Sequence, residues 1–185
     1  MTTAYISVRI DQVVSNAAIF LAGLFAWTFV EYLIHAWLSH TFETFATPLH
    51  AVHHRDPRAV FTIGAWIPSA LIYLGGIAIF GAAPGMIFFT GMVAGFVAYE
   101  AIHYRIHFRA PRNRLEAYLR TRHLVHHQRN PNISFGVSSQ LWDIVFSTEP
   151  TGAEKARLCA SVADSPPMTG PSNVHKLPEI LRRDL

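Results

Sequence analysis

Cysteine is almost absent from this sequence of 185 residues, because Cys159 is its single example. A lone cysteine excludes a disulfide within the chain and any metal site built from several thiolates. Charge is also scarce: Asp, Glu, Lys and Arg make up 15% of the residues, against about 25% in an average soluble domain. Residues 13–30 carry no charge, and neither do the 41 residues from 59 to 99. Uncharged stretches of this length argue against a soluble domain.

The uncharged runs predict helices that cross a membrane. A helix of about 20 apolar residues spans the hydrocarbon core of a bilayer. Three segments qualify, at roughly 13–35, 60–80 and 85–104, with a break near residues 81–85. The flank of the first carries only Arg9 and Asp11, so it lacks the basic region of a cleaved signal peptide. We therefore expect an all-α integral membrane protein with about three transmembrane helices.

Basic residues lie on one side of these predicted spans. Of the 15 Lys and Arg residues, Arg9 precedes the first span, two lie between 39 and 59, and the rest follow Tyr104. Positive residues stay on the cytoplasmic side of a membrane protein. We expect the loop 39–59 and the C-terminal region to be cytoplasmic, with a bacterial inner membrane as the location. The net charge of +3 fits a membrane surface, and no nucleic-acid motif accompanies it.

Histidine is abundant, and ten of the 11 residues fall into four tight groups on this predicted cytoplasmic face. His175 stands apart and is interpreted as a solvated residue. The patterns are H-x4-H, H-x2-H-H, H-x3-H and H-x2-H-H again. The ten residues are His35, His40, His50, His53, His54, His103, His107, His123, His126 and His127.

Helical geometry places most of these side chains on shared faces. Residues three or four apart lie on one face of an α-helix, so each H-x2-H-H trio is predicted to point along one stripe. His35 and His40 are five apart, and they converge only if the helix bends or ends between them, or if they flank the metals from two sides. Thr47 with Pro48 predicts the start of a short helix around the first trio, which Pro57 ends. Asn113 and Glu116 predict the start of the other, and Asn130-Pro131 its end.

The four groups together predict a centre of two metal ions with about five imidazoles for each. Ligation by nitrogen alone suits Fe, Zn, Cu or Ni and disfavours Mg or Ca. A single H-x3-H pair would be weak evidence, but four groups on one face are specific.

The histidine-bearing segments resemble the membrane fatty acid hydroxylase and sterol desaturase superfamily, and most closely its fatty acid 2-hydroxylases. The resemblance covers EYLIHAWLSH at 31–40, HAVHHRDP at 50–57, and the region 103–148 from HYRIHF to WDIVFST. It implies a domain over residues 1–148, followed by a tail at 149–185 that its prolines and small polar residues predict to be extended. Among the departures from the family pattern, Ala36 and Val52 stand where the family carries a basic residue and a glycine.

The resemblance further implies an O2-dependent, nonhaem diiron site whose ligands are the ten histidines. It implies hydroxylation of a C–H bond in a fatty acid or fatty-acyl lipid, with zinc as a metal that purified protein can contain instead. The chain has no room for a fused cytochrome b5, so we expect a separate donor of the cytochrome b5 or ferredoxin type. The alternatives are the same chemistry on a carotenoid or sterol, whether hydroxylation or desaturation, and a membrane protein that only binds metal.

Three acidic residues are candidates for supporting roles beside the metals. Glu31 and Glu100 lie within apolar spans, where a carboxylate is expensive and usually functional. We predict that they accept hydrogen bonds from ligand imidazoles and so fix the orientation of the rings. Asp143, in the WDIVFST segment, is expected to do the same for the last trio.

Overall fold

The computed structural model describes residues 2–58, 74, 77–78 and 83–167, and every regular element in those residues is helical. The predicted all-α fold class is confirmed. In chain order the elements are α1 (Thr2–Tyr32), η1 (Leu33–Thr41), α2 (Ala46–Arg55), α4 (Ala83–Phe108), α5 (Arg114–Gln128), α6 (Leu141–Val145) and α7 (Gly152–Ala160).

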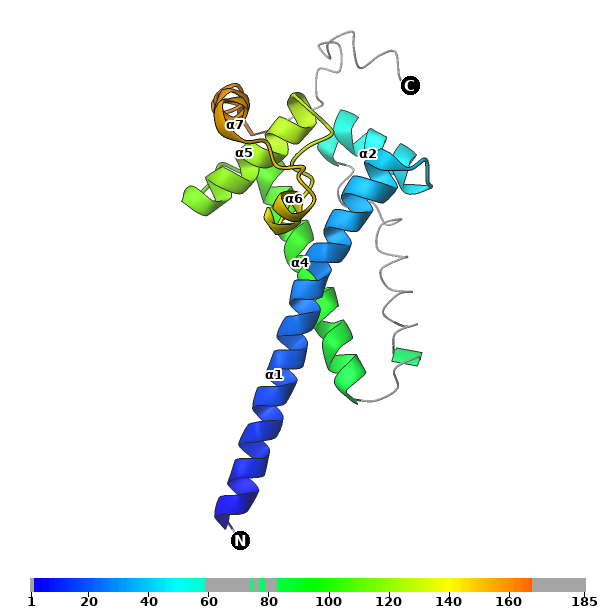
Figure 1. The fold of residues 1–185 in the computed structure, drawn as a ribbon, viewed down its shortest axis with the longest axis vertical. Coiled ribbons are helices and arrows are strands. Elements are labelled where there is room, and N and C mark those ends of the chain that lie inside the picture. Colours follow the sequence, from blue (N-terminus) through cyan, green and yellow to red (C-terminus); the bar gives the residue numbers. More distant parts are fainter. Residues whose placement is uncertain (1, 59–73, 75–76, 79–82, 168–185) are drawn as a thin grey trace.

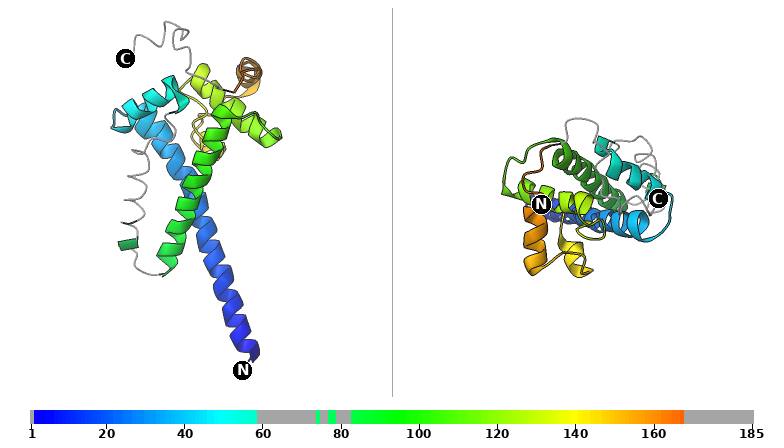
Figure 2. Two further views of the ribbon diagram at one scale, coloured as in Figure 1. Left: turned by 180° about the vertical axis from the view of Figure 1, so that it is seen from behind. Right: turned by 90° about the horizontal axis from the view of Figure 1, so that it is seen from above.

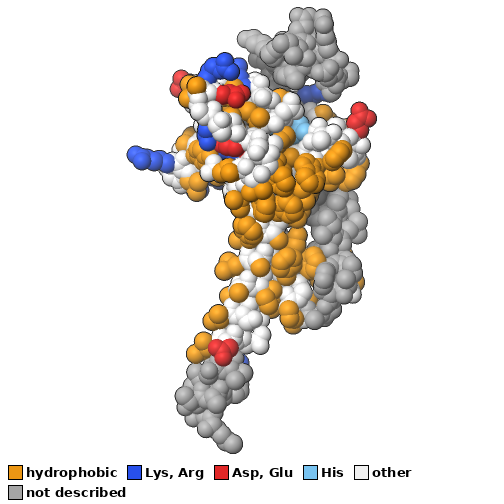
Figure 3. All heavy atoms as spheres, in the orientation of Figure 1, with side chains coloured by type: hydrophobic (Ala, Val, Ile, Leu, Met, Phe, Trp, Pro, Cys, Tyr) orange, Lys and Arg blue, Asp and Glu red, His pale blue; other side chains and the backbone are white. Residues whose placement is uncertain are grey.

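Two helical segments are long and apolar enough to cross a membrane, Arg9–Thr41 and Ala83–Phe108. They contain the predicted spans 13–35 and 85–104, whereas the predicted span 60–80 lies outside the described residues except for 74 and 77–78. Little of the apolar surface of either segment is buried; Val13 and Leu21, for example, are 67% and 57% exposed. Apolar side chains cover the surface of the long helices, and most charges lie at one end of the molecule (Figure 3).

The two long helices cross at a point of close backbone contact (Figure 1). A Cβ atom added to Gly23 would lie 2.0 Å from the carbonyl oxygen of Phe88, and one added to Gly91 would lie 2.1 Å from that of Phe20. Small residues let membrane helices approach in this way. The crossing therefore requires glycine at both positions, and it fixes how α1 and α4 diverge toward the histidine-bearing end.

The cap consists of α2, α5, α6 and α7, which gather where η1 and α4 end (Figure 1; Figure 2). α5 begins as predicted, because the Asn113 side chain accepts a hydrogen bond of 2.9 Å from the Glu116 N–H. The predicted start of α2 is wrong by two residues, since the helix begins at Ala46, with Phe45 at the N-cap. Thr47 lies inside the helix and donates its hydroxyl to the Phe42 carbonyl instead, at 2.9 Å.

The expectation of an extended tail from residue 149 is wrong for α7. Residues 153–160 are mostly Ala, Glu, Lys, Arg and Leu, which favour a helix, and four of the five prolines in residues 149–185 come later. The helix packs on α5, where Val162 forms a buried cluster with Leu124 and Val125, and Leu158 packs against it. Of residues 149–185, only those beyond 167 lie outside the described part of the chain.

Candidate metal centre

A π-helix brings the first two histidines onto one face. In a π-helix each N–H bonds to the carbonyl five residues earlier, so residues five apart stack as residues four apart do in an α-helix. η1 has this form from Leu33 to Thr41, and the rings of His35 and His40 lie 5.4 Å apart. This answers how the H-x4-H pair converges: the helix neither bends nor ends there but widens.

The ten histidines converge into two groups of five. In each group every histidine offers one ring nitrogen, and these nitrogens all lie within 4.8 Å of one another. The H-x2-H-H trios do not stay together: in each, the two histidines four apart share a group and the middle one joins the other. The first group is His35, His40, His50, His54 and His126, and the second is His53, His103, His107, His123 and His127.

Four nitrogens of the first group form a closed ring. In the order His35, His50, His54 and His126, successive Nε2 atoms are 3.0, 2.9, 3.1 and 3.1 Å apart. Two nitrogens bound at right angles to one ion, each about 2.1 Å from it, lie about 3.0 Å apart. The ring therefore has the dimensions of a ligand square around one ion, with His40 as the fifth donor.

Two of these nitrogens cannot be hydrogen-bonded to each other. Nδ1 of His35 lies 2.5 Å from the Phe135 carbonyl oxygen, and Nδ1 of His126 lies 3.0 Å from that of Ile133. A carbonyl only accepts, so both Nδ1 atoms carry the proton and both neutral rings present a lone pair at Nε2. Two lone pairs facing each other at 3.1 Å repel unless a cation lies between them. The donor set fits a metal ion.

The second group of histidines also brings ring nitrogens together at the spacing expected of metal ligands. The Nε2 atoms of His103, His107 and His123 form a triangle with sides of 2.9, 2.9 and 3.2 Å. The ring nitrogens of His53 and His127 have no hydrogen-bond partner in the described part of the chain. The two groups adjoin, since the rings of His54 and His127 stack at 4.1 Å.

The imidazoles of the cap are held in the neutral form, which is the form that binds metal. Burial lowers the pKa of the α2 and α5 histidines below the usual 6.5, and the neighbouring imidazoles add to this effect. The pKa of His54, for example, falls to about 2. Protons therefore compete weakly with a metal at neutral pH.

The loop of residues 133–138 supplies both carbonyl groups that orient His35 and His126. Glu31 holds one end of this loop, accepting hydrogen bonds from the Val137 and Ser138 N–H groups at 2.6 and 2.9 Å and from the Ser138 hydroxyl. The predicted contact between Glu31 and an imidazole is wrong. Its carboxylate binds the backbone of the loop instead, because that segment offers unpaired N–H groups beside α1.

Asp143 holds the other end of the loop and is fully buried. Its oxygens accept from the Phe135 and Gly136 N–H groups, both at 2.8 Å, and from Arg122 at 2.7 Å. Arg122 also donates to the Gly136 carbonyl at 2.8 Å. The predicted contact between Asp143 and a histidine is therefore wrong, although Asp143 acts on the same rings through the loop.

Glu100 is buried, but its Oε2 has no hydrogen-bond partner among the described residues. The predicted bond to a ligand imidazole is not found there. Sequence reasoning also missed Arg122, the Phe135 carbonyl and the Ile133 carbonyl. The sequence did contain a signal for Arg122, because this residue directly precedes His123 in the helix predicted to face the metals.

Comparison with known proteins supports the interpretation of this site. Residues 20–148 match the family model described as fatty acid hydroxylase, a range that contains all ten histidines. The chain is 33% identical over 144 residues to the fatty acid 2-hydroxylase of Mus musculus, covering 70% of this chain and 39% of the mouse protein. It is 34% identical over 151 residues to a dihydroceramide fatty acyl 2-hydroxylase of Arabidopsis thaliana, covering 72% and 61%.

A solved structure has the same fold. The visible hydroxylase domain of full-length scs7p superposes with a TM-score of 0.66 at 26% identity, over 85% of this chain and 60% of that one. The chain thus spans less than two thirds of the relatives it matches.

Proposed function

Since the chain belongs to the fatty acid hydroxylase family, we propose that it hydroxylates a C–H bond of a fatty acid or fatty-acyl lipid at a histidine-ligated diiron site. The observation that carries the proposal is the convergence of ten imidazoles into two groups of five at the end of two helices able to cross a membrane. Fatty acids and dihydroceramide fatty acyl chains are the substrates in the names of its relatives.

The donor set supports iron as the resident metal. Neutral imidazole is a borderline ligand that suits Fe, Zn, Cu and Ni, and iron is the one that the resemblance to the hydroxylase superfamily implies for O2 activation. Zinc would bind the same nitrogens after purification. Bound iron supplies the redox chemistry by which O2 oxidises an unactivated C–H bond. Two irons and O2 as co-substrate complete the proposed site, and a separate cytochrome b5-like or ferredoxin-type protein is the proposed electron donor.

The protein residues do the orienting and the exclusion of water. Hydrogen bonds from His35 and His126 to loop carbonyls fix each ring with its Nε2 lone pair directed into the group. His107 and His126 are fully buried, so water does not compete for these nitrogens. Ile144 and Val145 on α6 are each 56% exposed, which offers a lipid chain an apolar surface close to the loop.

We propose that the histidine face is cytoplasmic, in a bacterial inner membrane. The distribution of Lys and Arg supports this side. A reporter fused after Leu185 is expected to report the cytoplasm, and one inserted at Ala83 the opposite side. The reverse result would place the centre away from a cytoplasmic reductant.

Lipid analysis of a host with and without the gene, grown under O2 labelled with heavy oxygen, tests the function. We expect a fatty-acyl species that gains one labelled oxygen atom. His107→Ala and His126→Ala should abolish that product while the protein stays in the membrane, and His175→Ala should leave it unchanged. A hydroxylated carotenoid or sterol would redirect the substrate, and the absence of any oxidised lipid would favour a protein that only binds metal.

Elemental analysis tests the centre itself. After anaerobic iron loading, we expect about two irons for each chain, and each of the two histidine variants should lower that number. A content of one metal or none in the unaltered protein would contradict the dimetal centre.

A further inference from the structure

One face of α2 carries large apolar side chains that are exposed. Phe45, at the N-cap, Leu49 and Val52 are 73%, 58% and 48% exposed. Spacings of four and three residues place them on one stripe of the helix. The three histidines of α2 lie about a third of a turn away around the helix axis, on the side of the metal groups. α2 is therefore amphipathic, with an outward stripe that is apolar instead of polar.

The short helix α6 lies against the membrane-spanning part of α1. The ring of Trp142 packs on those of Phe25 and Phe29, with ring centres 6.0 and 4.5 Å apart. Both phenylalanines belong to the segment Arg9–Thr41 that is able to cross a membrane. The Trp142 N–H donates to the Thr28 hydroxyl at 2.9 Å, as a polar group must find a partner within the protein at membrane depth. α6 therefore lies beside the span and not above it.

The outer side of α6 continues this apolar surface. Asp143 is fully buried on the inner side, whereas Ile144 and Val145 are each 56% exposed. The next residue, Phe146, packs against Trp37 of η1 with ring centres 5.8 Å apart, and Trp37 is itself 41% exposed. The exposed apolar surface thus extends from α6 onto η1.

The same surface continues from η1 to α2. The spanning segment ends at Thr41 and α2 begins at Ala46, lying across the end of α1 instead of along its axis (Figure 1). Glu43 is the only Asp, Glu, Lys or Arg in residues 32–54. Apolar side chains on the cap merge with those of the long helices in Figure 3. The apolar face of the cap is therefore continuous with the lipid-facing surface of the spans.

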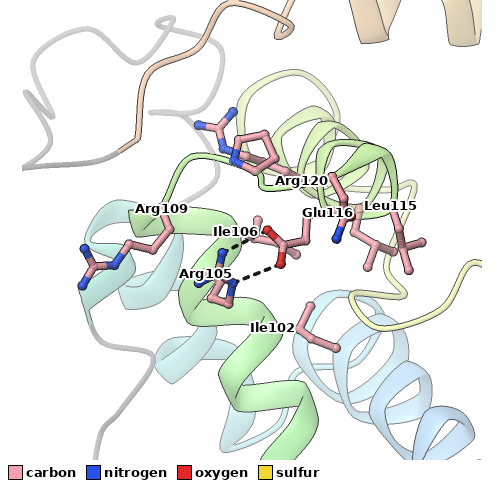
Figure 4. A pocket seen from close by; sticks show the side chains of 10 residues that line it. Ile102, Arg105, Ile106, Arg109, Leu115, Glu116 and Arg120 are labelled. Atoms are coloured by element: carbon pink, nitrogen blue, oxygen red, sulfur yellow. Dashed lines mark hydrogen bonds and ion pairs between the residues drawn. The ribbon is translucent and has the colours of Figure 1, made fainter.

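A charged pair marks the level at which α4 leaves the hydrocarbon. Arg105 in the last turns of α4 pairs with Glu116 of α5 at 3.0 Å, beside the cavity drawn in Figure 4. Both side chains are partly exposed, and Ile102, three residues earlier, is apolar. Exposed charges are costly inside a bilayer, so the headgroup level passes near Arg105. His103 and His107 lie on either side of Arg105 in the same helix.

We propose that α6 and the Phe45–Leu49–Val52 stripe of α2 are embedded in one leaflet of the bilayer. Part of the cap is then a monotopic membrane element, with its apolar face below the headgroups, and the histidine groups lie at headgroup level. The surface fits lipid better than an acidic redox protein, because neither the stripe nor the outer side of α6 offers a basic side chain. The proposal does not depend on the catalytic one.

Fluorescence quenching of single labels tests the proposal. Cys159 is the only cysteine, so Cys159→Ser provides a background in which Leu49→Cys or Val145→Cys carries one fluorescent label. The full-length protein is reconstituted into phosphatidylcholine vesicles. Bromine atoms on the acyl chains quench a label in the leaflet, and iodide on both sides of the vesicle quenches a label in water. We expect brominated lipid to quench both labels and iodide to leave them nearly unchanged.

Two further labels calibrate the measurement. Leu21→Cys, at a site 57% exposed within the span, should respond as the two test labels do. Glu154→Cys, at an exposed site on α7, should be quenched by iodide and not by brominated lipid. If either test label responds as Glu154→Cys does, the helix that carries it lies in water and the proposal fails. A test label that neither quencher reaches is covered by protein, which overturns the proposal as well.

A second pair of sites keeps the test decisive if a first variant does not fold. Val52→Cys and Ile144→Cys lie on the same two faces, and their side chains are 48% and 56% exposed. They should give the same two responses. The measurement requires neither substrate turnover nor a bound metal, so a failure here leaves the proposed hydroxylation untouched.

Discussion

Replacing Asp143 by Asn removes one charge from the most buried polar contact of the cap. Asp143 accepts from the N–H groups of Phe135 and Gly136 and pairs with Arg122. The amide group of Asn must direct its NH2 at one of these donors, whichever way it is turned. Losing one partner of a buried ion pair costs about 3–5 kcal/mol, and the lower end applies because Glu149 still pairs with Arg122.

The consequences of Asp143→Asn are unequal for the two histidine groups. A loss of about 3 kcal/mol lowers the Tm of a chain of this size by about 6–12 °C. The loosened loop no longer holds His35 and His126, which both belong to the first group. Losing such orienting contacts weakens metal binding by about 10–100-fold, while the second group has no bond to this loop.

Chelator competition followed by elemental analysis distinguishes these outcomes. Loaded wild-type protein should release its two metals over a similar range of chelator concentration, and Asp143→Asn should release one of them early. Asp164→Asn, at an exposed carboxylate of the same chain, is the matched control. If Asp143→Asn retains both metals with wild-type midpoints, the loop does not position the first group and the reasoning fails.

Three further predictions concern the helix crossing, the two buried acids and an ion pair. Gly91→Leu should prevent the close approach of the long helices and lower the yield of folded protein, whereas Ala98→Leu on the exposed side of α4 should not; equal yields by size-exclusion chromatography would contradict this. Glu31→Gln should lower the Tm more than Glu100→Gln, because only Glu31 holds the loop; the reverse order in thermal unfolding would be inconsistent. Hydrogen bonds from Arg105 and Arg112 lower the pKa of Glu116 to about 2, so its stabilising contribution is present above pH 4.5 and is lost as the pH falls toward 2. A carboxyl NMR titration with a midpoint near 4.5 would rule that out.

The two described membrane helices and the convergence of the ten histidines could be predicted from the sequence. Both features depend on local composition and spacing. Uncharged length is sufficient to indicate a span, and histidines three or four apart share a helix face whatever the tertiary structure. The capping of α5 by Asn113 is equally local, involving residues three apart.

The features that sequence could not predict depend on contacts between distant segments. The exchange of His53 and His126 between groups requires knowing that two clusters of imidazoles lie side by side where α2 and α5 meet. Glu31 reaches a loop 106 residues away, so nothing near it in the sequence indicates its true partner. The π-helix is a backbone choice that the H-x4-H spacing permits but does not require.

The distance in sequence between His35 and its loop carbonyl also orders the biosynthesis of the protein. The carbonyl that orients His35 belongs to Phe135, 100 residues later. At about 5–20 residues per second, the ribosome needs roughly 5–20 s to synthesise that interval. Throughout this time the first helix already displays His35 and His40, but the imidazole and carbonyl that complete their group do not yet exist. Loading of the proposed metal centre is therefore confined to the end of translation or later, after the last third of the chain has been synthesised.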